Sequence, residues 1–204
     1  MNKEPDLPSP ATHEDCLSDI RAELRAAMNG IAARSIRESG MGYRLVYGVE
    51  LPRLRQIAEA FTPDRRLAQA LWQTDVREEK MLAILLYPKN EFDADIAHLW
   101  MESLREEQAE LAGLMAMELL SVMPDASELA FLSMADERPM YQLCGLLTLT
   151  RLLMRGAMLA PDAANEFRDQ AESALHASYM PLRTAAQNAL ARLEENQEQA
   201  SPNS

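Results

Sequence analysis

The chain has 204 residues, 20 Lys and Arg against 32 Asp and Glu, and a formal net charge of −12, with 48% hydrophobic residues. A chain of this length is expected to form one globular domain that buries about 70% of its unfolded surface, so it needs neither disulfides nor a metal to fold. The net charge argues against a uniformly basic nucleic-acid-binding protein, because DNA affinity depends largely on cations that displace counterions.

The first fifty residues predict two helices followed by one irregular segment. Residues 1–11 are polar and rich in proline, which predicts a tail outside the folded domain. Apolar residues recur at helical spacing over 17–28, where Asn29-Gly30 ends the helix, and a short helix follows over 31–38. The segment 39–49 contains three glycines and two tyrosines and is the one irregular stretch of any length.

Proline marks the beginning of the next predicted helices, because its fixed backbone angle and missing N–H suit the first helical turn. Pro52 fits the first position of a helix that runs to Phe61. Thr62 and Pro63 repeat this arrangement and are expected to supply the cap and first turn of a helix over 63–73.

From residue 63 to residue 195 the predicted helices come in pairs. The first members are expected at 63–73, 92–103, 125–135 and 162–177, and the second members at 76–87, 105–122, 139–155 and 180–195. Successive second members begin 29, 34 and 41 residues apart. These intervals are typical of two-helix solenoid units.

Two of the second helices are alike in detail. Val76-Arg77 and Leu182-Arg183 are each followed by a run of small and apolar residues. This resembles the second helix of HEAT repeats, in which alanines let the two helices of a unit approach closely. The sequence therefore predicts an all-α fold, a HEAT-like helical-repeat solenoid or α-α superhelix, in a single domain over 12–195. The polar residues 196–204 predict a second tail.

The charge is distributed unevenly along the chain. Residues 1–20 carry 1 basic and 5 acidic residues, 21–80 carry 11 and 8, and 81–204 carry 8 and 19. The net charges of these three parts are −4, +3 and −11. The acidity therefore lies mostly towards the C-terminus, where a DNA backbone would be repelled.

Four motifs in the first half of the chain resemble the alkylpurine DNA glycosylase type of DNA alkylation repair proteins. In order, they are Tyr47-Gly48-Val49, Leu51-Pro52-Arg53-Leu54-Arg55, Leu71-Trp72, and Arg77-Glu78 with Ala83. The motifs lie within residues 40–105, and 106–195 agrees only in its helical rhythm. The resemblance implies a right-handed HEAT-like solenoid whose concave face, in active members, cradles duplex DNA.

Active members of this family also carry a Trp-x-x-x-Asp pattern, and the resemblance places its two residues near Ala109 and Gly113. A carboxylate there stabilises the oxocarbenium-like sugar that forms when a cationic alkylated purine leaves, and an aromatic face holds the cation. Neither residue is present. Glu110, one turn before Gly113, is the nearest carboxylate, and Glu106 is a second candidate. A further arginine of active members is replaced in the region of Gln142, Leu143 and Cys144.

These replacements predict a non-catalytic binding scaffold that uses its concave face for a protein partner or for nucleic acid, duplex DNA included. The alternative is a DNA glycosylase that excises alkylated purines with Glu110 or Glu106. A third possibility is a structural partner in an assembly, with the methionine-rich surface around 101–154 as its interface rather than as core.

Basic and aromatic residues alternate in only one region of the sequence, which is where we expect any nucleic-acid contact. The candidate residues are Arg34, Arg37, Arg44, Arg53, Arg55, Arg65, Arg66, Tyr43 and Tyr47. The alternative is a packed loop with solvated arginines.

The remaining residues predict no metal, no cofactor and no membrane partner. His13, His98 and His176 have no spacing typical of metal ligands. Cys16 and Cys144 lie far apart and outside any CxxC pattern, which favours a reducing compartment. The sequence shows neither a signal peptide nor a membrane span, so a cytoplasmic protein is expected.

Overall fold

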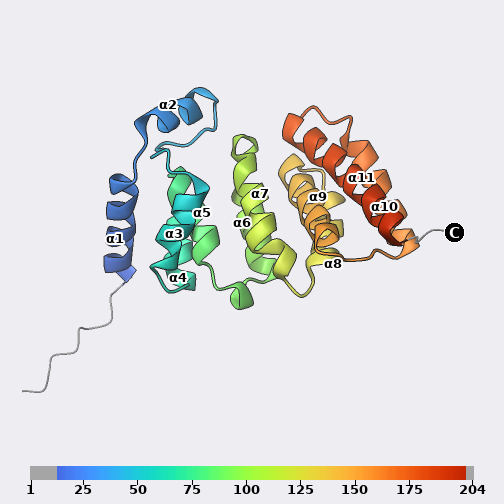
Figure 1. Ribbon diagram of the computed structural model, residues 1–204, viewed down its shortest axis with the longest axis horizontal. Helices are drawn as coiled ribbons and strands as arrows, with labels where there is room; N and C mark the ends of the chain where they lie inside the picture. The colour runs from blue at the N-terminus through green and yellow to red at the C-terminus, as the bar shows by residue number, and fades with distance from the viewer. Residues whose placement is uncertain (1–12, 201–204) are drawn as a thin grey trace, which may run out of the picture. The chain divides into compact units, whose positions relative to one another are not determined.

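The computed structural model describes residues 13–200, with side chains as far as residue 198, and its regular structure is helical (Figure 1). Eleven α-helices follow one another in this range: α1 (His13–Ala26), α2 (Gly30–Glu38), α3 (Leu51–Glu59), α4 (Arg65–Trp72), α5 (Arg77–Leu86), α6 (Ala94–Ser103), α7 (Ala109–Glu118), α8 (Ala126–Met134), α9 (Pro139–Met154), α10 (Pro161–Ala174) and α11 (Met180–Ala200). Among the described residues the only bridge of β type is an isolated one between Leu45 and Val76. The predicted all-α class is confirmed.

The helix bounds follow the predicted ranges approximately, and two of the differences concern α7 and α11. The helix expected over 105–122 is the shorter α7, which is flanked by 3₁₀ turns at Glu106–Gln108 and Leu120–Val122. The last helix continues to Ala200, past the point where we expected the tail of 196–204 to begin. The tail expected at 1–11 lies outside the described residues.

Side-chain caps explain where several helices begin. Asn29 accepts hydrogen bonds from the backbone N–H groups of the first turn of α2, and Asp93 accepts one from Ile96 at the start of α6. The cap expected at Thr62 is wrong. Asp64 caps α4 instead, because its carboxylate accepts the Leu67 N–H at 2.8 Å, and the helix begins two residues later than the Thr-Pro pattern predicts.

The described residues fall into two compact units. The first unit consists of 13–39 and 43–87, and the second unit consists of 40–42 and 88–200. The single domain expected over 12–195 stays a prediction.

In the first unit, α4 packs on α5 and on α1, and α3 packs on α5. The core is formed by fully buried aliphatic side chains: Ile20, Leu24, Leu54, Leu71, Leu82 and Ile84. The Asp64 N–H donates to the Leu86 carbonyl at 3.0 Å, so α4 begins beside the end of α5. The short α2 lies crosswise over the end of α1 (Figure 1).

In the second unit, α8 pairs with α9 and α10 pairs with α11, while α9 also packs on α7 and α11. Gly145 makes the close approach of α8 and α9 possible, because a Cβ at this position would lie 2.5 Å from the Ala130 carbonyl oxygen. On α11 the small residues Ala185, Ala186 and Ala189 are buried. The predicted small-residue face of this helix therefore packs inward.

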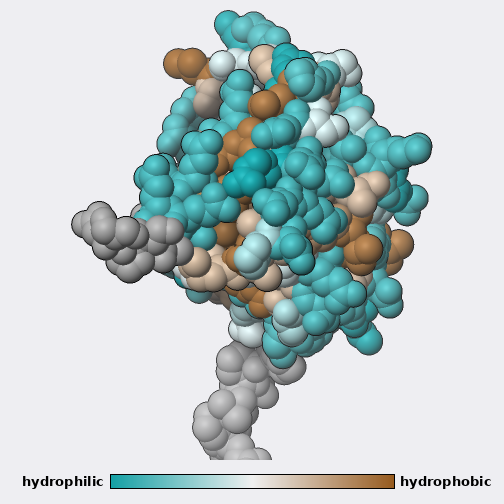
Figure 2. All heavy atoms as spheres, turned by 90° about the vertical axis from the view of Figure 1, so that its right-hand side faces the viewer, coloured by the Kyte–Doolittle hydropathy of each residue, from teal (hydrophilic) through white to brown (hydrophobic). Residues whose placement is uncertain are grey.

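The end of the second unit that α10 covers is hydrophilic over most of its surface (Figure 2). Phe167 and Ala171 of α10 are buried against the rest of the unit. The opposite face of the helix exposes four acidic side chains, Asp162, Glu166, Asp169 and Glu172. A polar outer face is typical of the last repeat of a helical array.

Candidate nucleic-acid interface

A buried carboxylate, Glu78, fixes the end of the irregular segment that precedes α3. It accepts the backbone N–H groups of Tyr47 and Gly48 at 2.9 Å and of Val49 at 3.3 Å. The Arg77 guanidinium donates to Glu78 at 3.1 Å and to the Val49 carbonyl at 3.2 Å. Because the charge of Glu78 is paired and its oxygens are hydrogen-bonded, this buried ion pair holds 47–49 in one conformation.

The next two charged residues of α5 are also buried and make packing contacts. Glu79 accepts two hydrogen bonds from Arg21 of α1, at 3.0 and 3.3 Å. The Lys80 ammonium donates to the Trp72 carbonyl at 2.6 Å and lies 4.6 Å from the centre of the Trp72 ring. The run of charges at the start of α5 therefore joins elements of the first unit.

The turn between α1 and α2 is packed directly on this segment. Gly48 has a φ of +76°, and a Cβ there would lie 2.3 Å from the Asn29 carbonyl oxygen and 2.5 Å from the Ala33 nitrogen. The Asn29 N–H donates to the Tyr47 carbonyl at 3.0 Å. Glycine at 48 is required both by its backbone angle and by this close contact.

Five of the predicted nucleic-acid contacts lie near this turn. Arg34 and Arg37 are exposed on α2, and Arg44 is exposed in the segment that Glu78 anchors. Arg53 and Arg55 lie in the first turns of α3, which begins directly after that segment. Arg53 forms an ion pair with Glu23 at 3.2 Å, and Arg55 is half-buried.

Arg65 and Arg66 lie at the other end of the first unit. They open α4, which begins beside the last residue of α5, whereas the segment 47–49 is bonded to the first turn of α5. The ten residues of α5 correspond to a length of about 15 Å. The structure therefore does not bring these two arginines together with the other five.

Tyr43 and Tyr47 are each only 9% exposed. Tyr47 also lies between the two anchors of the segment, because its N–H donates to Glu78 and its carbonyl accepts from Asn29. Neither ring can stack on a base without leaving the core. In this conformation the two tyrosines are packing residues, and the exposed candidate residues of the region are arginines.

The positions of the expected Trp-x-x-x-Asp pattern lie on a partly exposed stripe of α7. Ala109 and Gly113 are partly exposed, whereas the opposite face of the helix, including Leu111 and Met115, is buried. A Cβ on Gly113 would meet no atom within 4 Å. The site has room for a carboxylate but contains none.

A groove of about 240 Å³ runs beside Gly113 between α7 and α9. Its lining consists of Gly113, Ala116, Met117, Leu147, Thr150, Arg151 and Met154. No carboxylate and no aromatic ring contributes to this lining. The groove therefore has no aromatic ring to hold a cationic base and no carboxylate to stabilise the charge that develops when the base leaves.

The two carboxylates that could replace the aspartate lie outside this groove. Glu106 is exposed in the 3₁₀ turn before α7, and Glu110 is half-buried in the first turn of α7. The Tyr179 hydroxyl donates to the Glu106 backbone carbonyl at 2.5 Å. Burial, with the nearby charge of Glu106, raises the pKa of Tyr179 to about 12, so the hydroxyl stays a donor at neutral pH.

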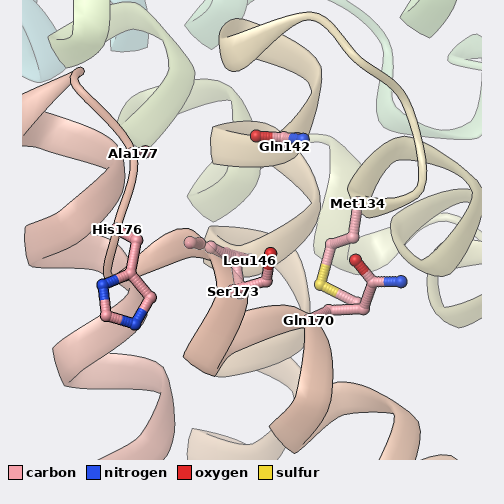
Figure 3. A pocket seen from close by; sticks show the side chains of 8 residues that line it. Met134, Gln142, Leu146, Gln170, Ser173, His176 and Ala177 are labelled. Atoms are coloured by element: carbon pink, nitrogen blue, oxygen red, sulfur yellow. The ribbon is translucent and has the colours of Figure 1, made fainter.

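The region where the resemblance expects a further arginine is uncharged. Leu143 and Cys144 are buried, and burial raises the pKa of the Cys144 thiol to about 12. Gln142 lines a pocket of about 260 Å³ that also includes Met134, Gln170 and His176, and Figure 3 shows His176 across the pocket from Met134 and Gln170. The Gln142 amide donates to the Asp136 carbonyl at 2.8 Å, and no arginine or lysine lines the pocket.

Residues 20–118 match a family model described as DNA alkylation repair enzyme. The matched range includes residues 40–105, which contain the four motifs of the resemblance. The predicted resemblance is confirmed for this part of the chain. No curated protein matches the sequence.

One solved structure is similar to this chain over most of its length. It comes from work described as "A new family of proteins related to the HEAT-like repeat DNA glycosylases with affinity for branched DNA structures". The similarity has a TM-score of 0.75 at 16% sequence identity and covers 89% of this chain and 77% of the other. At this identity the similarity shows the fold, and the predicted HEAT-like helical fold is confirmed.

Proposed function

We propose that this chain is a non-catalytic, HEAT-like scaffold related to DNA alkylation repair proteins, and that it binds DNA through the first unit. The contacts we propose are made by Arg34, Arg37 and Arg44, with Arg53 and Arg55 beside them. Arginines at the surface hold phosphates and set the position of the protein on the nucleic acid. The affinity for branched DNA described for the family of the similar structure supports DNA as the partner.

The charge around the α1–α2 turn favours a polyanion. Residues 28–55 contain five arginines and two acids, which is a net charge of +3 in a chain of −12. Among the described residues no ion pair or hydrogen bond engages the side chains of Arg34, Arg37 and Arg44. These three guanidinium groups are available to phosphates.

The empty position at Gly113 is the observation that carries the non-catalytic part of the proposal. Loss of a cationic purine leaves positive charge on the sugar, and a carboxylate placed close to it supplies the stabilisation. The α7 position that the resemblance assigns to this group carries no side chain, and Glu106 and Glu110 do not line the adjacent groove. The fold is retained without the group that performs the chemistry.

The second candidate is an alkylpurine DNA glycosylase, which the family match over 20–118 favours. A base-release assay on duplex DNA that contains 7-methylguanine separates the two candidates. We expect no release above the uncatalysed rate. Release that disappears in Glu110→Ala or Glu106→Ala would establish the glycosylase instead.

DNA binding is tested by measuring affinity for branched and linear DNA as a function of salt. We expect the triple variant Arg34→Ala, Arg37→Ala, Arg44→Ala to reduce the slope of log K against log salt by about 2.7 if each side chain holds one phosphate. The matched control is Arg65→Ala, Arg66→Ala, at the other end of the first unit, and it should keep the wild-type slope. If the wild type binds no DNA at low salt, the DNA proposal is wrong and a protein partner becomes the leading candidate.

We also propose a cytoplasmic location, on the ground that both cysteines are free thiols, as is usual in a reducing compartment. Separately, the helices of residues 13–200 include none with the length and apolar character of a membrane span.

A further inference from the structure

Two large apolar side chains are exposed at the turn between α1 and α2. Met28 is 60% exposed and Ile31 is 86% exposed, the highest value for a large apolar side chain in the described part of the chain. Single exposed apolar residues are common on protein surfaces, whereas two large ones at the same turn are less common.

The corner that carries them is fixed. The Asn29 side chain accepts the N–H groups of Ile31 and Ala32 at 3.1 Å, which defines the first turn of α2. The backbone of Asn29 is bonded to Tyr47 and lies in close contact with Gly48. The exposure of Ile31 is therefore a property of an anchored element.

Arginines of α1 and α2 lie close in sequence to the exposed pair. Ile31, Arg34 and Arg37 are spaced three residues apart on α2, so the apolar side chain and the two guanidinium groups follow one face of the helix. Arg25 lies in the last turn of α1, one turn before Met28, and Arg44 is exposed in the segment whose Tyr47 carbonyl accepts the Asn29 N–H. An exposed apolar pair with arginines on the neighbouring helical turns is complementary to a partner that has apolar surfaces between negative charges.

We propose that Met28 and Ile31 form a wedge that contacts unstacked bases at a branch point of DNA, while Arg34 and Arg37 hold the flanking phosphates. This inference rests on the proposed function. Proteins that kink DNA insert Ile, Met, Leu or Phe between base steps and must break the stacking there. At a branch point stacking is already interrupted, so an apolar wedge favours branched over linear DNA.

The experiment compares the wild type with Met28→Ser, Ile31→Ser on a three-way junction and on a linear duplex with arms of the same sequence. Losing the burial of these side chains should weaken junction binding by at least about tenfold, with duplex binding changed by less than about twofold. The matched control is Leu99→Ser, Leu132→Ser, which removes two apolar side chains that are each 61% exposed in the second unit. It should bind both DNAs as the wild type does.

A 2-aminopurine base at the branch point gives a second readout, because its fluorescence changes with stacking. The wild type should change this fluorescence on binding and the double variant should not. Junction binding that survives in the double variant but is lost in Arg34→Ala, Arg37→Ala overturns the wedge and leaves the proposed function standing. The wedge proposal is also overturned if the double variant loses affinity equally for the junction and the duplex. It is overturned as well if the wild type is an oligomer and the double variant is a monomer. Absence of any wild-type DNA binding overturns both proposals.

Discussion

Gly48 and Asn29 lie so close together that no side chain fits between them, since a Cβ on Gly48 would be 2.3 Å from the Asn29 carbonyl oxygen. This contact joins the segment before α3 to the turn before α2. Arg44 lies on this segment, and Arg34 and Arg37 lie on α2, which begins at this turn. The relative positions of these three arginines therefore depend on the contact.

We expect Gly48→Ala to lower the free energy of unfolding by about 3 kcal/mol, because it adds a backbone clash to the cost of a positive φ. Urea denaturation measures the change. Gly156→Ala is the matched control, because Gly156 has a φ of +85° but open space around it, and it should cost only about 1 kcal/mol. Equal losses in the two variants would show that the contact with Asn29 contributes nothing.

Glu78→Ala should be more damaging than the removal of any exposed carboxylate. It removes the carboxylate that pairs with the buried Arg77 and accepts three backbone N–H groups, and breaking a buried ion pair in this way typically costs about 3–5 kcal/mol. Hydrogen exchange at the amides of Tyr47, Gly48 and Val49 should also become faster. Glu106→Ala serves as the control and should leave both stability and exchange unchanged, within about 0.5 kcal/mol.

The Arg138 guanidinium, hydrogen-bonded to Asp136, lowers the pKa of that carboxyl from 3.8 to about 2. A pKa that is depressed in the folded state means that the charged form stabilises the fold. This contribution is complete above the ordinary value near 4 and is lost as the pH falls towards about 2. Urea denaturation between pH 2 and pH 6 should show a shallower acid decline for Asp136→Asn than for the wild type. Asp169→Asn, on the exposed face of α10, should follow the wild-type curve.

The two glycines inside helices of the second unit should respond in opposite directions to alanine. Gly113→Ala should stabilise the protein by about 0.5–1 kcal/mol, because alanine favours the helix and its Cβ meets no neighbour. Gly145→Ala should destabilise it by about 2 kcal/mol, because the added Cβ would lie 2.5 Å from the Ala130 carbonyl oxygen. Thermal unfolding of the pair gives the comparison. A destabilised Gly113→Ala variant would mean that the α7 groove is closed in solution.

The helices could be predicted from the sequence because their signals are local. Apolar spacing and the proline at position 139 lie within the helices that they define. Asn29-Gly30, predicted as the stop of the first helix, follows the end of α1 at Ala26 and begins α2, with Asn29 as its cap. The Thr-Pro pattern predicts a cap at Thr62, but Asp64, two residues later, accepts the Leu67 N–H and caps α4.

The site was less predictable because its contacts join distant parts of the chain. Glu78 lies 31 residues from Tyr47 in sequence, so spacing alone could not show that the tyrosine is buried. Nor could it show that Arg65 lies a helix length away from Arg44. Ile31 follows directly after Asn29-Gly30, and this local pattern does not show whether another element of the fold covers the side chain.

The full burial of Cys144 leaves the folded chain with one thiol that reagents can reach. Cys16, on α1, is partly exposed, and the chain has no third cysteine. A maleimide dye should therefore label the native protein once, in the first unit, without any engineered cysteine. The slow arrival of a second label would time the opening of α9, so the wild-type sequence carries its own reporter of local unfolding.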